Sequence, residues 1–360
     1  MKIFLASSFL IFFIFIGLFS ISHANATGMI PTITLRTTNT IVLPNPATTS
    51  IGTPIIFHAK VVDSSGGTKL IPSGQVTWSD NGVGGVFNFT SCILKPLNGS
   101  VSSARCDIVY TPVASMGPVT ITATYSGDGI HHSSTTSSPL TVNLRITKSV
   151  IANHWPTSPI GLTFRYVAEV YDASAGSKSL PTGQVVWNDG GAGGTFTSNL
   201  CTLVQYTTLS SIGGCWVEYT NPLTTEQITL NATYLGDSFH KTSQSSSSLS
   251  ITLRPTTTLV SPNPVNANTG VPVTLHAKVI DSSAGTKIIP TGQITWNDGG
   301  AGGRFDTSSC TLTPLSRSTT SAICNTTYTT TKVDPVIITV NYSGDDTHNS
   351  SSGSSSLTVS

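Results

Sequence analysis

The sequence of 360 residues contains little charge. Asp, Glu, Lys and Arg together make up 9% of it, and the formal net charge is +1. This balance provides neither a basic surface for nucleic acid nor an acidic surface for cations in bulk. Solubility must therefore come from hydroxyl and amide groups. We interpret Ser-rich runs such as residues 133–138 and 350–356 as polar loops or frayed edges.

Catalytic motifs are also lacking. The chain has no nucleophile elbow, no phosphate-binding glycine loop before a helix and no HExxH motif. A histidine does recur three residues after an aspartate, at Asp128/His131, Asp237/His240 and Asp345/His348. Tight Gly-Asp turns favour such self-capping residues, and the ring can pack there without a ligand. We predict no enzymatic activity, no cofactor and no metal site.

A long apolar run occurs only at the N-terminus, from Lys2 to about Ile21, and it ends in Ala24-Asn25-Ala26. This small-x-small site predicts a secretory signal peptide over residues 1–26. The alternative is an uncleaved run that anchors the chain, because about 20 apolar residues span a membrane. After cleavage no membrane span is expected, and the protein is predicted to be secreted or held at the cell surface.

The remaining chain is one unit repeated three times. Trp78, Trp187 and Trp296 are 109 residues apart, and most other motifs keep that step. A period this long corresponds to a whole domain rather than to one turn of a solenoid. The predicted domains are repeat 1 (residues 27–144), repeat 2 (145–253) and repeat 3 (254–360). One residue is missing between Cys324 and Tyr342, where we expect a surface loop.

Strand-like alternation is clear within each unit. In repeat 1, Ile55, Phe57, Ala59 and Val61 form one apolar face, and no segment keeps a 3.6-residue period. Turn residues separate about seven such segments in roughly 100 residues, which is typical of an antiparallel β-sandwich. The fold class is therefore all-β, with three tandem sandwiches whose cores the three tryptophans anchor.

A known family shares these motifs. The "GQVTW" strand, the Gly-rich turn, the "TLTPL" strand, the "YT" strand and the final "ITATYSGD" strand resemble the bacterial and archaeal Ig-like repeat family, group 3. The resemblance covers all three repeats. It implies Ig-like sandwiches that serve as spacers, stalks or adhesive modules, usually without enzymatic activity.

Each repeat carries two cysteines after its tryptophan. Cys92 and Cys106 enclose a turn at Asn98-Gly99, which predicts two adjacent strands of a hairpin joined by a disulfide. Such a bond stabilises a domain by roughly 3 kcal/mol. A metal site is the rival interpretation, but it lacks the four ligands that structural zinc requires. The expected pairs are Cys92/Cys106, Cys201/Cys215 and Cys310/Cys324.

Two further patterns leave alternatives open. Recurring aspartates such as Asp63, Asp80 and Asp128 would suit calcium if loop ends brought them together, although the junctions contain no acidic residue. We instead expect Asp63 to pair with Lys69 across a loop. Glycosylation and chance both explain the Asn-x-Ser/Thr pattern at Asn88, Asn98, Asn231, Asn325, Asn341 and Asn349.

Repeat 2 differs from the others in its aromatic residues, Trp155, Tyr171, Tyr206 and Trp216. Trp216 alternates with Cys215 and Val217, so it is exposed if that face meets solvent. These rings either bind a cell-surface glycan or protein partner, or seal the contact with a neighbouring domain or cover a hydrophobic edge. The sequence thus predicts a non-catalytic structural and adhesion protein, with ligand binding through repeat 2 as the alternative function.

Overall fold

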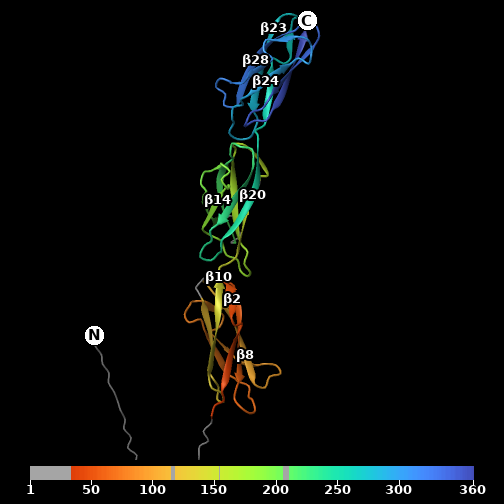
Figure 1. Ribbon diagram of the computed structural model, residues 1–360. Coiled ribbons are helices and arrows are strands. Elements are labelled where there is room, and N and C mark those ends of the chain that lie inside the picture. The colour runs from red at the N-terminus through yellow and green to blue at the C-terminus, as the bar shows by residue number, and fades with distance from the viewer. Residues whose placement is uncertain (1–33, 115–117, 154, 206–210) are drawn as a thin grey trace, which may run out of the picture.

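The computed structural model describes residues 34–114, 118–153, 155–205 and 211–360. Within these ranges the regular structure consists of strands, and no helix there is long and apolar enough to cross a membrane. The strands form six sheets that pair into three Ig-like β-sandwiches, one for each repeat. Figure 1 shows the three sandwiches following one another end to end.

Corresponding strands occupy corresponding places in the three sandwiches. Repeat 1 contains β1 (Thr38–Leu43), β2 (Ala47–Ser50), β3 (Ile55–Asp63), β4 (Gln75–Ser79), β5 (Val86–Phe87), β6 (Ser91–Ile93), β7 (Lys95–Pro96), β8 (Ser103–Thr111), β9 (Val119–Tyr125) and β10 (Ser134–Asn143). Repeat 2 contains β11 (Thr147–Ile151), β12 (Thr157–Pro159), β13 (Thr163–Asp172), β14 (Gln184–Asn188), β15 (Thr195–Phe196), β16 (Leu200–Thr202), β17 (Val204–Gln205), β18 (Ile212–Thr220), β19 (Gln227–Tyr234) and β20 (Ser243–Thr252). Repeat 3 contains β21 (Thr256–Ser261), β22 (Val265–Ala267), β23 (Pro272–Asp281), β24 (Gln293–Asn297), β25 (Arg304–Phe305), β26 (Ser309–Thr311), β27 (Thr313–Pro314), β28 (Ser321–Thr329), β29 (Val336–Tyr342) and β30 (Ser351–Val359).

In each sandwich the first strand of the chain belongs to one sheet and the second strand to the other. In repeat 1 one sheet has the order β1-β3-β8-β5, with β7 also paired to β8, and the other has the order β2-β10-β9-β4-β6. The chain changes sheets between β1 and β2, because β1 pairs antiparallel with β3 whereas β2 pairs parallel with β10. Repeats 2 and 3 have the same order, so the position of a residue in one repeat defines its equivalent in the others.

The core follows the predicted alternation. Phe57, Ala59 and Val61 on β3 are fully buried, and the ring of Trp78 on β4 lies 6.3 Å from that of Phe57. Trp187 and Trp296 occupy the equivalent places, and all three tryptophans are at most 5% exposed. The prediction that each tryptophan anchors a core is confirmed.

The Ser-rich segments are strands, which corrects our interpretation of them as loops or frayed edges. Residues 134–143 form β10 and residues 351–359 form β30. Each strand has a buried inward hydroxyl with a hydrogen-bond partner: the Oγ of Ser138 donates to the carbonyl oxygen of Pro44 over 2.8 Å, and that of Ser355 to the carbonyl oxygen of Pro262 over 2.7 Å. A buried hydroxyl with an acceptor is compatible with a strand facing the core, and composition alone does not reveal that acceptor.

The cysteines do not lie on adjacent strands of a hairpin, so that part of the disulfide prediction was wrong. Cys92 is on β6, which pairs with β4 in one sheet, whereas Cys106 is on β8 in the other sheet. The chain changes sheets at the buried residue Leu94, and β7 then forms the hairpin with β8. The bonds therefore join the two sheets of each sandwich, at Cys92–Cys106, Cys201–Cys215 and Cys310–Cys324.

The Gly-rich turn after each tryptophan makes room for a tyrosine. A Cβ on Gly85 would lie 2.0 Å from the Oη of Tyr110, and Gly194 and Gly303 meet their tyrosines in the same way. Tyr110 donates a hydrogen bond to Asp80 over 3.2 Å. Burial and the Asp80 carboxylate raise the pKa of Tyr110 to about 12. The glycines thus have a packing role.

Candidate functional site

Arg145 lies at the junction of repeats 1 and 2, between β10 and β11. Its side chain is buried and donates hydrogen bonds in two directions. Within repeat 2, Nε donates to the Oδ2 of Asp172 over 2.8 Å, and Nη2 donates to the carbonyl oxygen of Ser177 over 2.6 Å. Nη1 donates to the carbonyl oxygen of Ile51 in repeat 1 over 2.7 Å. One guanidinium therefore links the carboxylate of its own repeat to the backbone of the preceding repeat.

Arg254 makes the same contacts at the second junction. Its Nε lies 2.8 Å from the Oδ2 of Asp281, and its Nη2 donates to the carbonyl oxygen of Thr286. Nη1 donates to the carbonyl oxygen of Ile160 in repeat 2 over 2.6 Å. We call Arg145 and Arg254 the junction arginines. Their shared geometry indicates that successive repeats meet in the same orientation.

Arg36 is the equivalent residue of repeat 1. Its Nε donates to the Oδ2 of Asp63 over 2.8 Å, and its Nη2 donates to the carbonyl oxygen of Thr68 over 2.5 Å. Its side chain is 21% exposed, compared with 3% for Arg145, and no described residue accepts from its Nη1. Among the described residues, Arg36 therefore makes the two hydrogen bonds within its own repeat but lacks the third bond, which in Arg145 and Arg254 reaches the preceding repeat.

The aspartates that hold these arginines are stabilised as carboxylates. Burial raises the pKa of Asp281, but hydrogen bonds from Ser283, the backbone N–H of Ile288 and Arg254 outweigh it and lower the pKa to about 2. The same balance lowers the pKa of Asp172, with Ser179 and Arg145 as donors. Each junction arginine therefore faces a charged partner at neutral pH, in a setting where removal of either charge is costly.

Asp63 does not pair with Lys69, so that prediction was wrong. Asp63 is buried and bonds to Arg36, whereas the Nζ of Lys69 donates to the carbonyl oxygen of Ser65. Burial makes the planar guanidinium the better partner, because it donates to the carboxylate and to nearby carbonyl oxygens at once. In the described ranges no group of three or more His, Cys, Asp or Glu residues is arranged to hold a metal ion.

Apolar contacts accompany the polar link at the second junction. A Cβ on Gly285 of repeat 3 would lie 2.5 Å from the Cδ1 of Leu162 in repeat 2. A Cβ on Gly161 would lie 3.6 Å from the Cδ1 of Ile288, again across the junction. The Leu162 side chain thus contacts repeat 3 at Gly285, and glycine suits this residue because its φ is positive at 68°.

Repeat 2 contains an array that resembles a catalytic triad. The Oγ of Ser179 lies 2.9 Å from the Nε2 of His240, whose Nδ1 lies 2.9 Å from Asp237. The backbone N–H of Ser179 is already bonded to Asp172, so it is not free to stabilise an oxyanion. Asp172 also lies 3.4 Å from the Oγ, where a nucleophile would develop negative charge. This arrangement opposes acyl transfer and suits a structural hydrogen-bond network.

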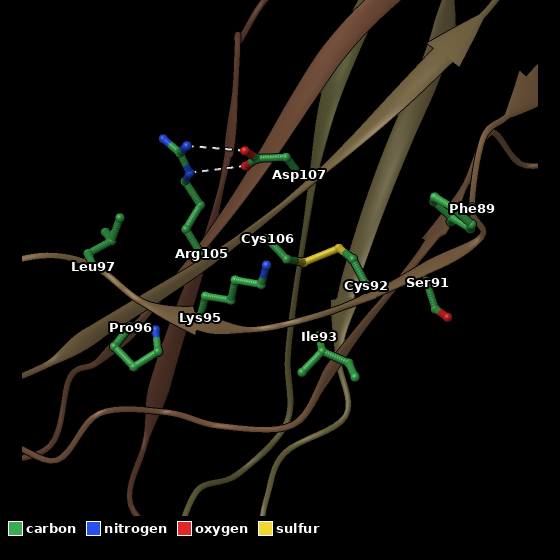
Figure 2. Close-up of a pocket in the computed structure, with 10 residues that line it drawn as sticks. All are labelled: Phe89, Ser91, Cys92, Ile93, Lys95, Pro96, Leu97, Arg105, Cys106 and Asp107. Carbon is green, nitrogen blue, oxygen red and sulfur yellow. Dashed lines mark hydrogen bonds and ion pairs between the residues drawn. A yellow bond between two sulfur atoms is a disulfide. The ribbon is translucent and has the colours of Figure 1, made fainter.

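In repeat 1 a hollow lies where β6 and β7 meet the outward face of β8. Its volume is about 500 Å³, and the Cys92–Cys106 disulfide forms part of its lining. Figure 2 shows Lys95 extending toward the disulfide and Arg105 paired with Asp107. Phe89 and Ile93 also line the hollow and are largely exposed. The hollow thus combines cationic and apolar groups.

The equivalent face of repeat 2 carries Trp216, which is 50% exposed as the alternation predicted. The guanidinium carbon of Arg165 lies 3.9 Å from the centroid of its ring, so a cation covers one side of the indole. Arg165 also lies 3.9 Å from Glu218 on the neighbouring strand. The ring nevertheless remains half exposed to solvent.

The other aromatic candidates of repeat 2 occupy different places. Trp155 is 48% exposed, and its ring lies 5.5 Å from that of Phe164, which faces the core. Trp155 therefore covers one end of the core, in line with the sealing alternative. Tyr171 donates to Glu169, and this bond together with burial raises its pKa to about 12. Tyr206 lies outside the described residues.

No protein-family model matches the chain, and no curated protein matches it. Among solved structures, the I9–I11 tandem of titin is similar at 12% identity over 89% of this chain and 98% of that one, with a TM-score of 0.25. The ICAM-5 D1–D4 ectodomain fragment is similar at 10% identity over 89% and 77% (TM-score 0.32). The Escherichia coli adhesin FdeC is similar at 11% identity over 90% and 96% (TM-score 0.25).

Proposed function

We propose that this chain is a secreted or cell-surface structural and adhesion protein, built of Ig-like spacer modules and without catalytic activity. The observation that carries the proposal is the repeated junction, in which Arg145 and Arg254 bond to the backbone of the preceding repeat. No flexible linker separates the sandwiches, because β10 ends at Asn143 and β11 begins at Thr147. A chain of modules in fixed orientation acts as a spacer.

The remaining sequence-based expectations belong to this proposal. They are removal of residues 1–26, domain limits at 27–144, 145–253 and 254–360, and membership of the group 3 Ig-like family. The disulfides support export, since such bonds persist in oxidising compartments. Cell fractionation tests the location: the protein should be found outside the cytoplasm with an N-terminus near Thr27. Recovery of the protein in the membrane fraction with residues 1–26 still attached would favour the alternative, in which the uncleaved apolar run anchors the chain.

Electron microscopy of single molecules tests the spacer role. Domains with strands of about ten residues, at roughly 3.3 Å each, are about 30 to 35 Å long, so three in line approach about 100 Å. Rods of that length with a narrow range of bending are expected. Compact particles with the three domains folded together would rule out a spacer.

Ligand binding by repeat 2 is the second candidate function, supported by the half-exposed ring of Trp216. A glycan array probed with the secreted protein tests it. Trp216→Ala should abolish any binding, whereas Trp155→Ala, at a ring that packs on Phe164, should retain it. Equal loss in both variants would show that binding depends on domain integrity rather than on a ligand surface.

A further inference from the structure

Three basic residues lie side by side across the outward face of repeat 1. Lys60 on β3 is directly opposite Arg105 on β8, and Arg105 is directly opposite Lys95 on β7. Strand alternation places all three side chains on the solvent face. Directly opposite residues of antiparallel strands have Cβ atoms about 4.5 to 5.5 Å apart, and like charges there are destabilising. We call Lys60, Arg105 and Lys95 the basic row.

Neighbouring acids compensate only part of this repulsion. Asp107 lies 3.0 Å from Arg105, but it also pairs with His58 over 2.8 Å. Neither Lys60 nor Lys95 has an ion-pair partner among the residues that the structure describes. A chain with 9% charged residues thus places three cations where they repel one another, which is typical of a functional site rather than of a stabilising one.

The fold does not require the basic row. The same three positions hold Glu169, Gly214 and Val204 in repeat 2 and Lys278, Ile323 and Thr313 in repeat 3, so only the lysine of the first position recurs, in repeat 3. Both of those sandwiches have the same strand order as repeat 1. The row is therefore specific to repeat 1.

The basic row borders the hollow shown in Figure 2. Lys95 and Arg105 line it, and Phe89 presents a ring that is 67% exposed. A volume of about 500 Å³ is within the range of pockets that accept small organic groups. Cations beside an exposed aromatic ring fit a ligand that carries both anionic groups and apolar C–H surfaces.

We propose that this face of repeat 1 binds an acidic polysaccharide, with carboxylates paired to the basic row and a sugar ring against Phe89. A polymer with spaced carboxylates can satisfy several cations of the row together. An extended acidic peptide fits less well, because β3 occupies one edge of β8 while β5 and β7 occupy parts of the other. The proposal depends neither on the junction arginines nor on Trp216.

Isothermal titration calorimetry with polygalacturonate tests this proposal on the secreted full chain. Binding is expected at low salt, and it should weaken as salt rises from about 50 mM to about 0.5 M, because exposed charges are screened. Lys60→Gln/Lys95→Gln should weaken binding by on the order of tenfold or more. The matched control is Lys278→Gln, which removes the equivalent of Lys60 in repeat 3 and should leave binding unchanged.

A melting curve separates loss of binding from loss of folding. The double variant relieves repulsion, so its Tm should be unchanged or higher, while neutral dextran should not bind to either protein. The proposal is overturned if polygalacturonate does not bind at low salt or if Lys278→Gln weakens binding equally. It is also overturned if polyglutamate or DNA binds more tightly than polygalacturonate.

Discussion

The Nη1 of Arg145 lies 2.7 Å from the carbonyl oxygen of Ile51, 94 positions earlier in the chain and in the preceding domain. The same guanidinium holds the buried carboxylate of Asp172. Swivelling of repeat 2 against repeat 1 would break the bond to Ile51 and open the buried ion pair to rearrangement. Arg254 repeats this link at the next junction, so the same kind of polar contact joins each pair of neighbouring domains.

Replacement of one core tryptophan should destabilise one domain only. Trp187→Ala removes a ring that is 1% exposed, and we expect a loss of about 3 to 5 kcal/mol in the free energy of unfolding of repeat 2. Calorimetry that resolves the three domain transitions measures this loss. Trp216→Ala, at a half-exposed ring of the same repeat, is the control and should have a much smaller effect. Equal shifts in all three transitions would contradict independent cores.

Acid should destabilise the domains through their buried aspartates. The pKa of Asp281 is lowered from 3.8 to about 2, so this carboxyl binds protons more weakly in the folded state than in the unfolded one. Its contribution, roughly 2 kcal/mol, is fully present above about pH 5 and is lost as pH falls toward 2. Urea unfolding of repeat 3 between pH 7 and pH 2.5 measures it. Stability that stays constant over this range, or rises on acidification, would contradict the assignment.

Loss of a disulfide should destabilise its own sandwich by roughly 3 kcal/mol, because the bond closes a loop of about 15 residues. Cys201→Ala/Cys215→Ala makes this change in repeat 2, where the bond joins β16 to β18 across the two sheets. Chemical unfolding gives the magnitude, and mass spectrometry of non-reduced peptides gives the pairing. Peptides linked between different repeats would show that the pairing is wrong.

The Ser-rich strands provide a matched pair for testing buried hydroxyls. Ser138 is fully buried and donates to Pro44, whereas its neighbour Ser137 on β10 is exposed. Ser138→Ala removes a buried donor and leaves the carbonyl oxygen of Pro44 without its partner, which should cost about 1 kcal/mol. Ser137→Ala should change the free energy of unfolding by less than about 0.5 kcal/mol. If both variants change the free energy of unfolding by similar amounts, the buried hydrogen bond from Ser138 to Pro44 does not stabilise β10.

Periodicity predicted most of the fold, because the strands with apolar inward faces, such as β3 and β9, alternate cleanly in the sequence. It failed for β10 and β30, because hydroxyls occupy inward positions in their Ser-rich parts and buried apolar side chains, such as Leu140 and Leu357, follow only toward their C-terminal ends. It also missed the change of sheet at Leu94, since a single buried leucine between two short strands has no distinctive pattern. The disulfide pairs were nevertheless predictable, because each repeat contains only two cysteines.

The candidate sites were harder to predict from the sequence than the fold. Leu-Arg recurs at every junction, but the sequence does not indicate that the guanidinium reaches back 94 positions to another domain. The buried partner Asp63 was assigned to Lys69, which is nearer in sequence, because spacing does not reveal burial. The exposure of Trp216 followed from alternation on its strand. The basic row was missed because its members come from three separate strands and meet only through register.

Small-angle scattering of three proteins tests most directly whether the junction arginines fix the orientation of the domains. Arg145→Lys/Arg254→Lys keeps both charges but not the planar fork that reaches two partners, so it should give a shorter, broader distribution of interatomic distances. Arg36→Lys makes the same change where the described residues show no bond between repeats, and it should match the unmodified chain near about 100 Å. If the double variant also matches the unmodified chain, the junction arginines do not hold the rod.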